Sequence, residues 1–280
     1  MDIFKKIVGI VGCFLLTVPS YAGIKVNEVM PCNISTYMDT SVYDFPGWIE
    51  LYNDGETESL KGYTLKHYKI KKGGAKELKY SWEIKEDIKV ESESYCLIFC
   101  DEENVSKHAP FKLDSDGGTV ELYKGDKQLD VLSYGAMDAH ISYGRSGDNE
   151  GYMNPTPKKA NSGAYRLEDR VSKPEFSGKH PGVVSGNFSI KLNCKTGGAP
   201  IYYTTDGSEP TQESSLYDGD ISIASTTIIK ARAFLEDKPA SEILTGTFLY
   251  MDSRHADCGG YTVPIVSIST NIDYFEDPQI

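Results

Sequence analysis

The chain has 280 residues, a formal net charge of −12, 26 glycines and 19 tyrosines. Its length accommodates two ordinary domains, and its glycine and tyrosine content, with no long run of helical period, predicts an all-β fold. The acidic balance disfavours a broad contact with nucleic-acid phosphates or an anionic membrane surface, so we expect neither as a partner.

Residues 1–22 are predicted to be a signal peptide. Two lysines precede an apolar run from Ile7 to Val18 that is too short to span a bilayer, and the segment ends with a small-x-small pattern at Ala22. We expect cleavage after Ala22, hence a secreted, periplasmic or cell-surface protein with no membrane span after cleavage. A lipobox ending at Cys13 is an alternative, but it comes very early and the apolar run continues beyond it.

The stretch around Trp48 is the strand on which the first half of the chain is organised. Ile49 and Leu51 alternate with Trp48 and Glu50, the period of two that is typical of a strand with one face on a core. A turn at residues 53–55 ends this strand. Another alternating strand is predicted over residues 24–30, and the polar residues 31–45 are predicted to form a long exposed loop.

A lysine-rich hairpin is predicted over residues 67–79, with its tip at the glycine pair 73–74. Lysines at such a place protect an edge strand from pairing with another chain, and a contact patch for an acidic partner is the alternative. The apolar strand 95–100 follows. Its Cys96 and Cys100 would lie about 13 Å apart on one face, too far to bridge, so we predict small buried hydrophobic residues.

A second hairpin is predicted from two alternating runs, 119–123 and 129–135, joined by a turn at Gly125-Asp126. Ile-Ser-Tyr-Gly-Arg at 141–145 and a closing Asn-Pro-Thr-Pro…Ala-Asn-Ser at 154–162 complete the pattern. Together with Trp-Ile-Glu-Leu-Tyr-Asn from Trp48, this order resembles the lamin-tail domain family over residues 24–163. The resemblance implies an immunoglobulin-like β-sandwich; some members bind DNA, which the negative charge here argues against.

Residues 164–173 are predicted to be a linker, and a second domain is expected over 174–250. Ile-Tyr-Tyr-Thr-Thr-Asp-Gly-Ser-Glu-Pro-Thr at 201–211 is followed by Ile-Ile-Lys-Ala-Arg-Ala-Phe at 228–234, where small apolar and basic residues alternate. These motifs resemble the chitobiase and β-hexosaminidase C-terminal domain over about 172–250. The resemblance implies a second immunoglobulin-like or fibronectin-like sandwich without catalytic residues, so glycosidase activity is not implied.

Residues 251–280 are predicted to be a linker and the start of an incomplete domain. A strand pattern at Val263–Thr270 is followed by Asp273, Tyr274 and Phe275. Residues 262–280 are similar to the opening of the spore coat protein H-like family, an atypical kinase fold. All catalytic positions of that family would lie beyond Ile280.

No phosphate-binding loop, nucleophile elbow or paired-histidine zinc helix occurs in the sequence. The acidic clusters 101–103 and 114–116 lack EF-hand spacing, so we predict no metal site, no cofactor and no catalytic residue. Paired carboxylates from distant strands stay open as a possibility. The histidines are expected at the surface: His67, His108, His140, His180 and His255.

Tyrosine is the remaining candidate for binding. Exposed aromatic rings stack on sugars or anchor protein partners, although most tyrosines of a sandwich only pack. Several stand near predicted loops, including Tyr37 and Tyr261. We select three candidates: Tyr202, Tyr217 and Tyr43.

These observations predict an exported protein with two tandem immunoglobulin-like β-sandwiches. We expect non-catalytic modules that tether or position a larger surface or secreted protein through an extracellular protein or a glycan. One alternative is the accessory N-terminal region of a spore coat protein H-like kinase. The other is a carbohydrate-binding module.

Overall fold

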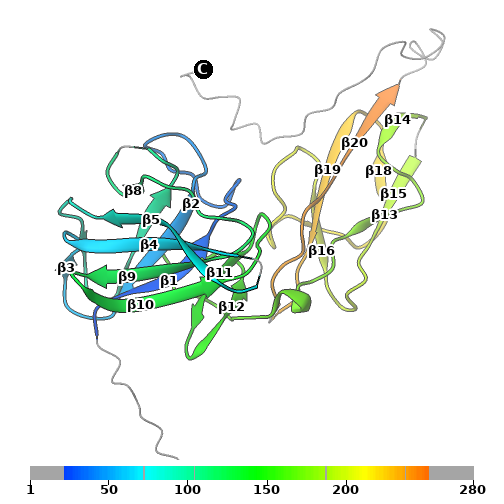
Figure 1. Ribbon diagram of the computed structural model, residues 1–280. Helices are drawn as coiled ribbons and strands as arrows, with labels where there is room; N and C mark the ends of the chain where they lie inside the picture. Colours follow the sequence, from blue (N-terminus) through cyan, green and yellow to red (C-terminus); the bar gives the residue numbers. More distant parts are fainter. Residues whose placement is uncertain (1–21, 72, 104, 187, 237, 252–280) are drawn as a thin grey trace, which may run out of the picture.

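The computed structural model describes residues 22–71, 73–103, 105–186, 188–236 and 238–251. Its regular structure is β-strand apart from the 3₁₀ helix η1, Leu167–Asp169, and forms two β-sandwiches that lie side by side (Figure 1). The predicted all-β, immunoglobulin-like fold is confirmed. The predicted signal peptide, Cys13 and the 262–280 segment lie outside the described residues.

The first sandwich packs a six-stranded sheet against a four-stranded sheet. In spatial order, the six-stranded sheet contains β12 (Asn149–Met153), β11 (Ser142–Ser146), β1 (Ile24–Met30), β2 (Gly47–Asn53), β7 (Ser94–Cys100) and β8 (His108–Ala109). The four-stranded sheet contains β10 (Lys127–Tyr134), β9 (Gly118–Lys124), β4 (Tyr63–Ile70) and β5 (Lys76–Glu83). A short pair, β3 (Glu58–Ser59) and β6 (Lys89–Val90), lies beside them.

The second sandwich packs a three-stranded sheet against a five-stranded sheet. The smaller sheet contains β13 (Glu175–Ser177), β15 (Phe188–Asn193) and β18 (Ile221–Ile223). The larger contains β14 (Gly182–Ser185), β20 (Leu244–Met251), β19 (Thr227–Ala233), β16 (Ile201–Thr204) and β17 (Ser215–Leu216). As the alternation on β19 predicts, Ile229, Ala231 and Ala233 face the core and are fully buried.

Strand β2 is buried on both faces, which the sequence pattern did not predict. Ile49 and Leu51 face the core as expected, but Trp48 and Glu50 on the opposite face are also fully buried. The prediction that residues 31–45 form an exposed loop is wrong in part, because this loop packs toward Trp48. Its Asn33 is buried and donates through Nδ2 to the carbonyl oxygens of Tyr37 (2.7 Å) and Pro46 (2.9 Å).

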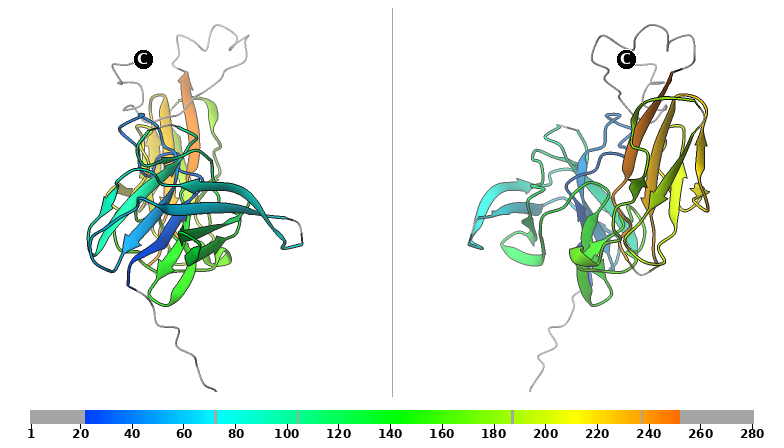
Figure 2. Two further views of the ribbon diagram at one scale, coloured as in Figure 1. Left: turned by 60° about the vertical axis from the view of Figure 1, so that its left-hand side comes forward. Right: turned by 90° about the vertical axis from the view of Figure 1, so that its right-hand side faces the viewer.

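The lysine-rich hairpin is confirmed. It is formed by β4 and β5, β5 is the edge strand of its sheet, and Figure 2 shows the hairpin projecting from the first sandwich. Several of its charges are paired, for example Lys71 with Glu77 at 3.3 Å and Lys76 with Glu121 at 3.6 Å. The hairpin of β9 and β10, with its turn at residues 125–126, is also confirmed.

The predicted burial of Cys96 and Cys100 is confirmed. Cys96 and Cys100 are buried on β7, and both are free thiols, as are Cys32 and Cys194. Cys258 lies outside the described residues.

The segment between the two sandwiches is tied to both of them. Tyr165 pairs with Tyr152 of β12 through two backbone hydrogen bonds of 2.8 Å, and Val171 is buried in the second core. Arg170 donates from Nε to the Ala240 carbonyl at 2.9 Å, and the Ala240 amide donates to Asn154 Oδ1 at 2.8 Å. The two units therefore share direct contacts beyond the covalent connection.

Candidate functional site

A buried pair of carboxylates lies on the outer face of the six-stranded sheet. Glu28 on β1 pairs in register with Glu50 on β2, and neither side chain is exposed. They are covered by residues 154–162, here called the closing segment. Thr156 donates to Glu28 from its amide (3.1 Å) and its hydroxyl (2.9 Å), and the Lys158 amide donates to Glu50 at 2.5 Å.

Two further side chains complete this network. The Ser142 hydroxyl donates to Glu28, and Asn27 donates from Nδ2 to Glu50 at 2.8 Å. Burial raises the pKa of Glu50 to about 8, and the neighbouring charge of Glu28 adds to the rise despite the donors from Lys158 and Asn27. Burial also raises the pKa of Glu28. The pair is closed off from solvent, so it has no access to a substrate and holds the closing segment in place.

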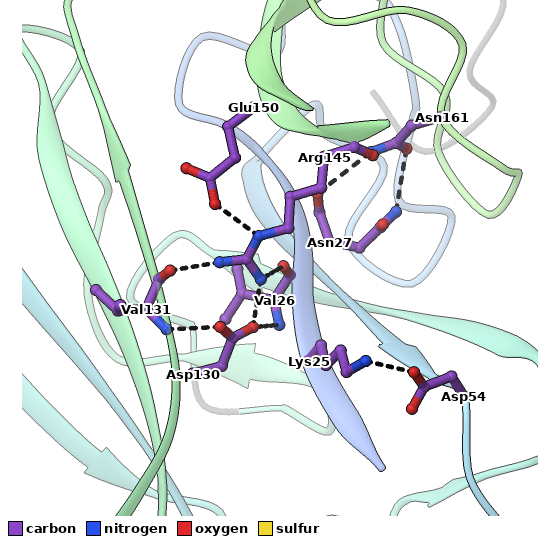
Figure 3. Close-up of polar contacts among 9 residues, drawn as sticks. All are labelled: Lys25, Val26, Asn27, Asp54, Asp130, Val131, Arg145, Glu150 and Asn161. Atoms are coloured by element: carbon purple, nitrogen blue, oxygen red, sulfur yellow. Dashed lines mark hydrogen bonds and ion pairs between the residues drawn. The ribbon is translucent and has the colours of Figure 1, made fainter. Parts of the chain in front are cut away.

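Arg145 on β11 ties the other end of β1 to the opposite sheet (Figure 3). β1 pairs with β11 at Glu28 and Val29, and its ladder with β2 is irregular between Val26 and Glu28. Beyond this pairing, Arg145 Nη1 donates to the Val26 carbonyl at 2.9 Å and forms an ion pair with Asp130 of β10. Asp130 Oδ2 in turn accepts the Val26 amide at 2.8 Å. Side chains thus replace the missing backbone pairing.

Asn161 links the Arg145 cluster to the carboxylate pair. Its Nδ2 donates to the Arg145 carbonyl at 2.8 Å, and its Oδ1 accepts from Asn27 at 3.0 Å (Figure 3). The same Oδ1 lies 2.9 Å from the Thr156 hydroxyl oxygen. A Cβ on Gly144 would lie 2.5 Å from the Asn27 carbonyl oxygen, so only glycine fits there. The Asn-Glu, Gly-Arg and Asn-Pro-Thr-Pro…Asn stretches of the sequence therefore meet in one structural network.

The prediction of surface histidines is wrong for three residues. His67, His108 and His140 are buried, because β-strand pairing and the covering loops enclose them, whereas His180 is exposed. His67 Nε2 lies 3.1 Å from the Tyr134 hydroxyl inside the first core. His255 lies outside the described residues.

His108 is held between two carboxylates. Its Nδ1 lies 2.8 Å from Asp101 Oδ2, and its Nε2 lies 2.9 Å from Asp39 Oδ2. The two ring nitrogens therefore bridge a carboxylate of the 31–46 loop and a carboxylate at the end of β7. The Asp39–His108–Asp101 cluster fixes the loop over 31–46 to the end of β7.

The three candidate tyrosines lie apart from one another. Tyr43 is 62% exposed in the loop of the first sandwich. Tyr202 is on β16 directly opposite the exposed Leu216, which puts it on the outer face of the five-stranded sheet. Tyr217, the next residue after Leu216, packs against the second core. The structure therefore brings none of the three together.

Tyr202 instead contacts an aromatic residue that sequence reasoning did not select. Its ring meets Phe234 edge to face at a centroid distance of 5.6 Å. The Arg232 guanidinium lies 5.4 Å from the centre of the Phe234 ring. Phe234 follows the alternating strand β19, and an aromatic residue just beyond a strand end is the signal that could have identified it.

A crevice of about 320 Å³ opens beside Phe234 where the two sandwiches meet. Asn154 and Pro155 line it from the first sandwich, and Gln212, Arg232, Phe234 and Lys238 line it from the second. Thus an aromatic ring, two side-chain amides and two cationic side chains border one hollow. Residues from both units are needed to form it.

Arg232 is fixed in this crevice by backbone oxygens. Its Nε donates to the Ser241 carbonyl at 2.9 Å, and its Nη2 donates to the His140 carbonyl of the first sandwich at 3.3 Å. Burial lowers the pKa of Arg232 to about 10. His140 Nδ1 lies 3.5 Å from Glu209, a second polar contact across the same junction.

No group of three or more metal-ligating side chains converges anywhere in the described ranges. The acidic stretches 101–103 and 114–116 accordingly do not gather a ligand set there. Within the same ranges, no helix has the length and apolar character needed to cross a membrane.

Comparison with known proteins identifies one of the two sandwiches. The chitobiase/beta-hexosaminidase C-terminal domain family matches residues 179–245, within the region where the sequence motifs predicted it. This part of the prediction is confirmed. A search of curated proteins gives no match. The similarities to lamin-tail domains and to spore coat protein H-like proteins stay predictions.

Proposed function

We propose that the chain is a non-catalytic module that contacts a glycan, and that the crevice beside Phe234 is the contact site. The observation that carries this proposal is the combination, in one hollow, of the Phe234 ring with the polar groups of Gln212, Arg232 and Lys238. Ligand sites typically join apolar walls to a few orienting polar groups in this way. Export to the cell exterior, as expected from residues 1–22, would bring the module to such a ligand.

The crevice residues suggest how a sugar would be held. The apolar face of a pyranose ring would rest against the Phe234 ring, which Tyr202 holds through an edge-to-face contact. The Gln212 amide can both donate to and accept from sugar hydroxyls, and Lys238 can donate. Arg232 is already engaged with two carbonyl oxygens, so it would shape the site more than it would bind.

The matched family supplies the first ligand to test, because its description names enzymes of β-linked N-acetylhexosamine sugars. We expect a soluble polymer of β-linked N-acetylglucosamine, included in the gel, to retard the full chain in affinity electrophoresis. The Gln212→Ala and Phe234→Ala variants should lose most of this retardation. Tyr43→Ala, an exposed tyrosine of the other sandwich, is the matched control and should migrate like the wild type.

Two results would count against the proposal. One is the absence of retardation by any neutral amino-sugar polymer. The other is unchanged retardation of Gln212→Ala. The Gln212 side chain is exposed, so its loss should not affect folding. Tyr202→Ala and Tyr217→Ala complete the series. Tyr217 packs against the core, so an effect of its loss on binding has to be separated from an effect on folding.

A second candidate function rests on residues 262–280, which resemble the opening of a spore coat protein H-like kinase domain. In that case the two sandwiches would be the accessory front end of a phosphotransferase. The intact mass of the protein isolated from its source cells distinguishes the two accounts. A mass much greater than 31.0 kDa favours the kinase account, and a mass lower by the signal peptide alone argues against it.

A further inference from the structure

A second cavity lies on the first sandwich, on the outer face of the six-stranded sheet. It has a volume of about 280 Å³, close to the lower end of about 300 Å³ for small-ligand sites. Six of its lining residues matter here: Tyr37, Tyr95, Phe99, Lys107, His108 and Lys158. The site proposed above uses none of them.

Aromatic rings form the wall of this cavity. Phe99 lies under Tyr37, with centroids 6.3 Å apart and a 23° angle between the rings. Tyr95 stacks on Tyr52 at 4.7 Å, and both rings are half-buried. The Tyr95 ring is therefore held by a neighbour and still offers surface, as a platform for a sugar ring requires.

Two lysines on the cavity carry charges that are not neutralised by an ion pair. Lys158 points its ammonium at Tyr37, where it contacts the hydroxyl and lies 4.8 Å from the ring centre. Neither Lys158 nor Lys107 forms an ion pair with a carboxylate in the part of the chain that the structure describes.

The backbone holds both lysines in an unusual conformation. Their φ angles are +66° for Lys107 and +61° for Lys158, in the left-handed region that is unfavourable for a non-glycine residue. Glycine or asparagine would relieve this strain, yet the chain has a long cationic side chain at both positions. Strained positions of this kind cluster at ligand sites.

The nearby carboxylates do not cancel this positive charge. Asp39 also lines the cavity, but its carboxylate already accepts from the Ser41 amide and hydroxyl and contacts His108. Glu50, which accepts the Lys158 amide, retains its proton at neutral pH because burial raises its pKa to about 8. Among the lysine and carboxylate side chains that line the cavity, Lys107 and Lys158 outnumber Asp39, on a chain of net charge −12.

We propose that this cavity binds the carboxylate-bearing sugar of an acidic glycan. The pyranose ring would lie against Tyr95 and Tyr37, and its carboxylate would lie between Lys107 and Lys158. Ammonium–carboxylate hydrogen bonds are among the stronger ones, and the aromatic wall excludes water on one side. This site is separate from the Phe234 crevice in position, charge and ligand class, so the two proposals stand or fall independently.

The test is calorimetric titration of the full chain with tetragalacturonate and with its methyl ester, which has the same sugars but no charge. We expect tetragalacturonate to bind at least tenfold more tightly than the ester, with an affinity that falls as salt is raised. A tetrasaccharide that contains glucuronate serves as a second acidic probe. Equal binding of the charged and esterified forms, or no binding of either acidic probe at millimolar concentration, would overturn the proposal.

Variants locate the site. The double change Lys107→Gln with Lys158→Gln should weaken binding at least tenfold, and glutamine keeps a similar side-chain length at the two left-handed positions. Lys159→Gln, at the exposed residue next to Lys158, is the matched control and should bind as the wild type does. Tyr95→Ala should weaken binding, whereas Tyr95→Phe should retain it. If the double variant binds tetragalacturonate normally, the assignment is wrong.

Discussion

The two sandwiches bury their central strands differently. In the second sandwich, β15 alternates along its length: Phe188, Ile190 and Leu192 face the core, whereas the residues between them are exposed. In the first, β2 is buried along both faces, with Ile49 inward and Trp48 and Glu50 outward. The first sandwich thus has a third layer, made by the 31–46 loop and the closing segment.

This difference changes what stabilises each unit. The second sandwich depends mainly on apolar packing between two sheets around Phe248, which meets Phe176 at 5.4 Å and Phe188 at 5.8 Å. The third layer of the first sandwich has in addition a buried polar network around Glu28 and Glu50. Such a network stabilises a fold only when each of its members has a partner.

The largest effect is expected for Phe248→Ala. Truncating a fully buried phenylalanine costs about 3–5 kcal/mol, which is a large part of the stability of a small domain. We expect the second sandwich to unfold at a clearly lower temperature while the first one keeps its transition. Calorimetry with hydrogen exchange read by mass spectrometry would assign each transition to its residues.

Phe111→Ala is the matched change, since Phe111 is fully buried in the first core. It should lower the other transition instead. If either variant increased hydrogen exchange equally in both sandwiches, the two units would form a single cooperative structure, and they would not differ in what stabilises them.

The next largest effect is expected for Glu28→Ala. It removes the acceptor of the Thr156 amide and of the Ser142 and Thr156 hydroxyls, and unsatisfied buried donors cost about 1–3 kcal/mol. We predict a loss of about 2–3 kcal/mol in the first sandwich, with faster hydrogen exchange in residues 154–162. Lys191→Ala changes an exposed residue of β15 and is the control. It should change the free energy of unfolding by no more than about 0.5 kcal/mol.

A graded effect is expected from pH, and it is small over any single pH unit. The pKa of Glu50 is raised from 4.5 to about 8, so the native state retains a proton that the unfolded chain has already released. Its stabilising contribution is complete below pH 4.5 and is lost as the pH rises through about 8. The free energy of unfolding of the first sandwich should therefore fall over this window, by at most about 1.4 kcal/mol per pH unit.

Glu50→Gln isolates this contribution, because glutamine resembles the protonated acid and does not titrate. The variant should show a flatter pH profile and should be more stable than the wild type near pH 8, with Glu28 as the remaining raised group. Chemical unfolding at a series of pH values measures the slope of the pH profile and the stability near pH 8. An unchanged slope in the variant would mean that Glu50 is ionised in the native state.

The strands were predictable wherever alternation and turn residues were local signals. The β9–β10 hairpin and the inward Ile229 of β19 follow from their own sequence. The burial of Trp48 did not, because the residues that cover it come from a loop whose polar sequence is typical of solvent exposure. Polar side chains such as Asn33 bind backbone oxygens under that cover, and sequence alone does not indicate such pairing.

The candidate sites show the same limit. The exposed tyrosines could be selected by residue type, and Tyr202 does lie next to the crevice through Phe234. The crevice itself needs Asn154 and Gln212 from different sandwiches, and the second cavity needs Lys107 and Lys158 from distant loops. Convergence of residues so far apart in sequence is a property of the tertiary structure.

The closing segment also has a consequence for the order of folding. Glu28 is near the start of the first sandwich, whereas its partner Thr156 is 128 residues further along the chain. Contacts of such sequence separation slow folding, because a long loop must close before they contribute. A chain synthesised from its N-terminus cannot supply the closing-segment donors of Glu28 and Glu50 until residues 156 and 158 are available. A fragment that ends earlier would leave both glutamates without their donors from the closing segment and would present them to any chaperone or protease nearby.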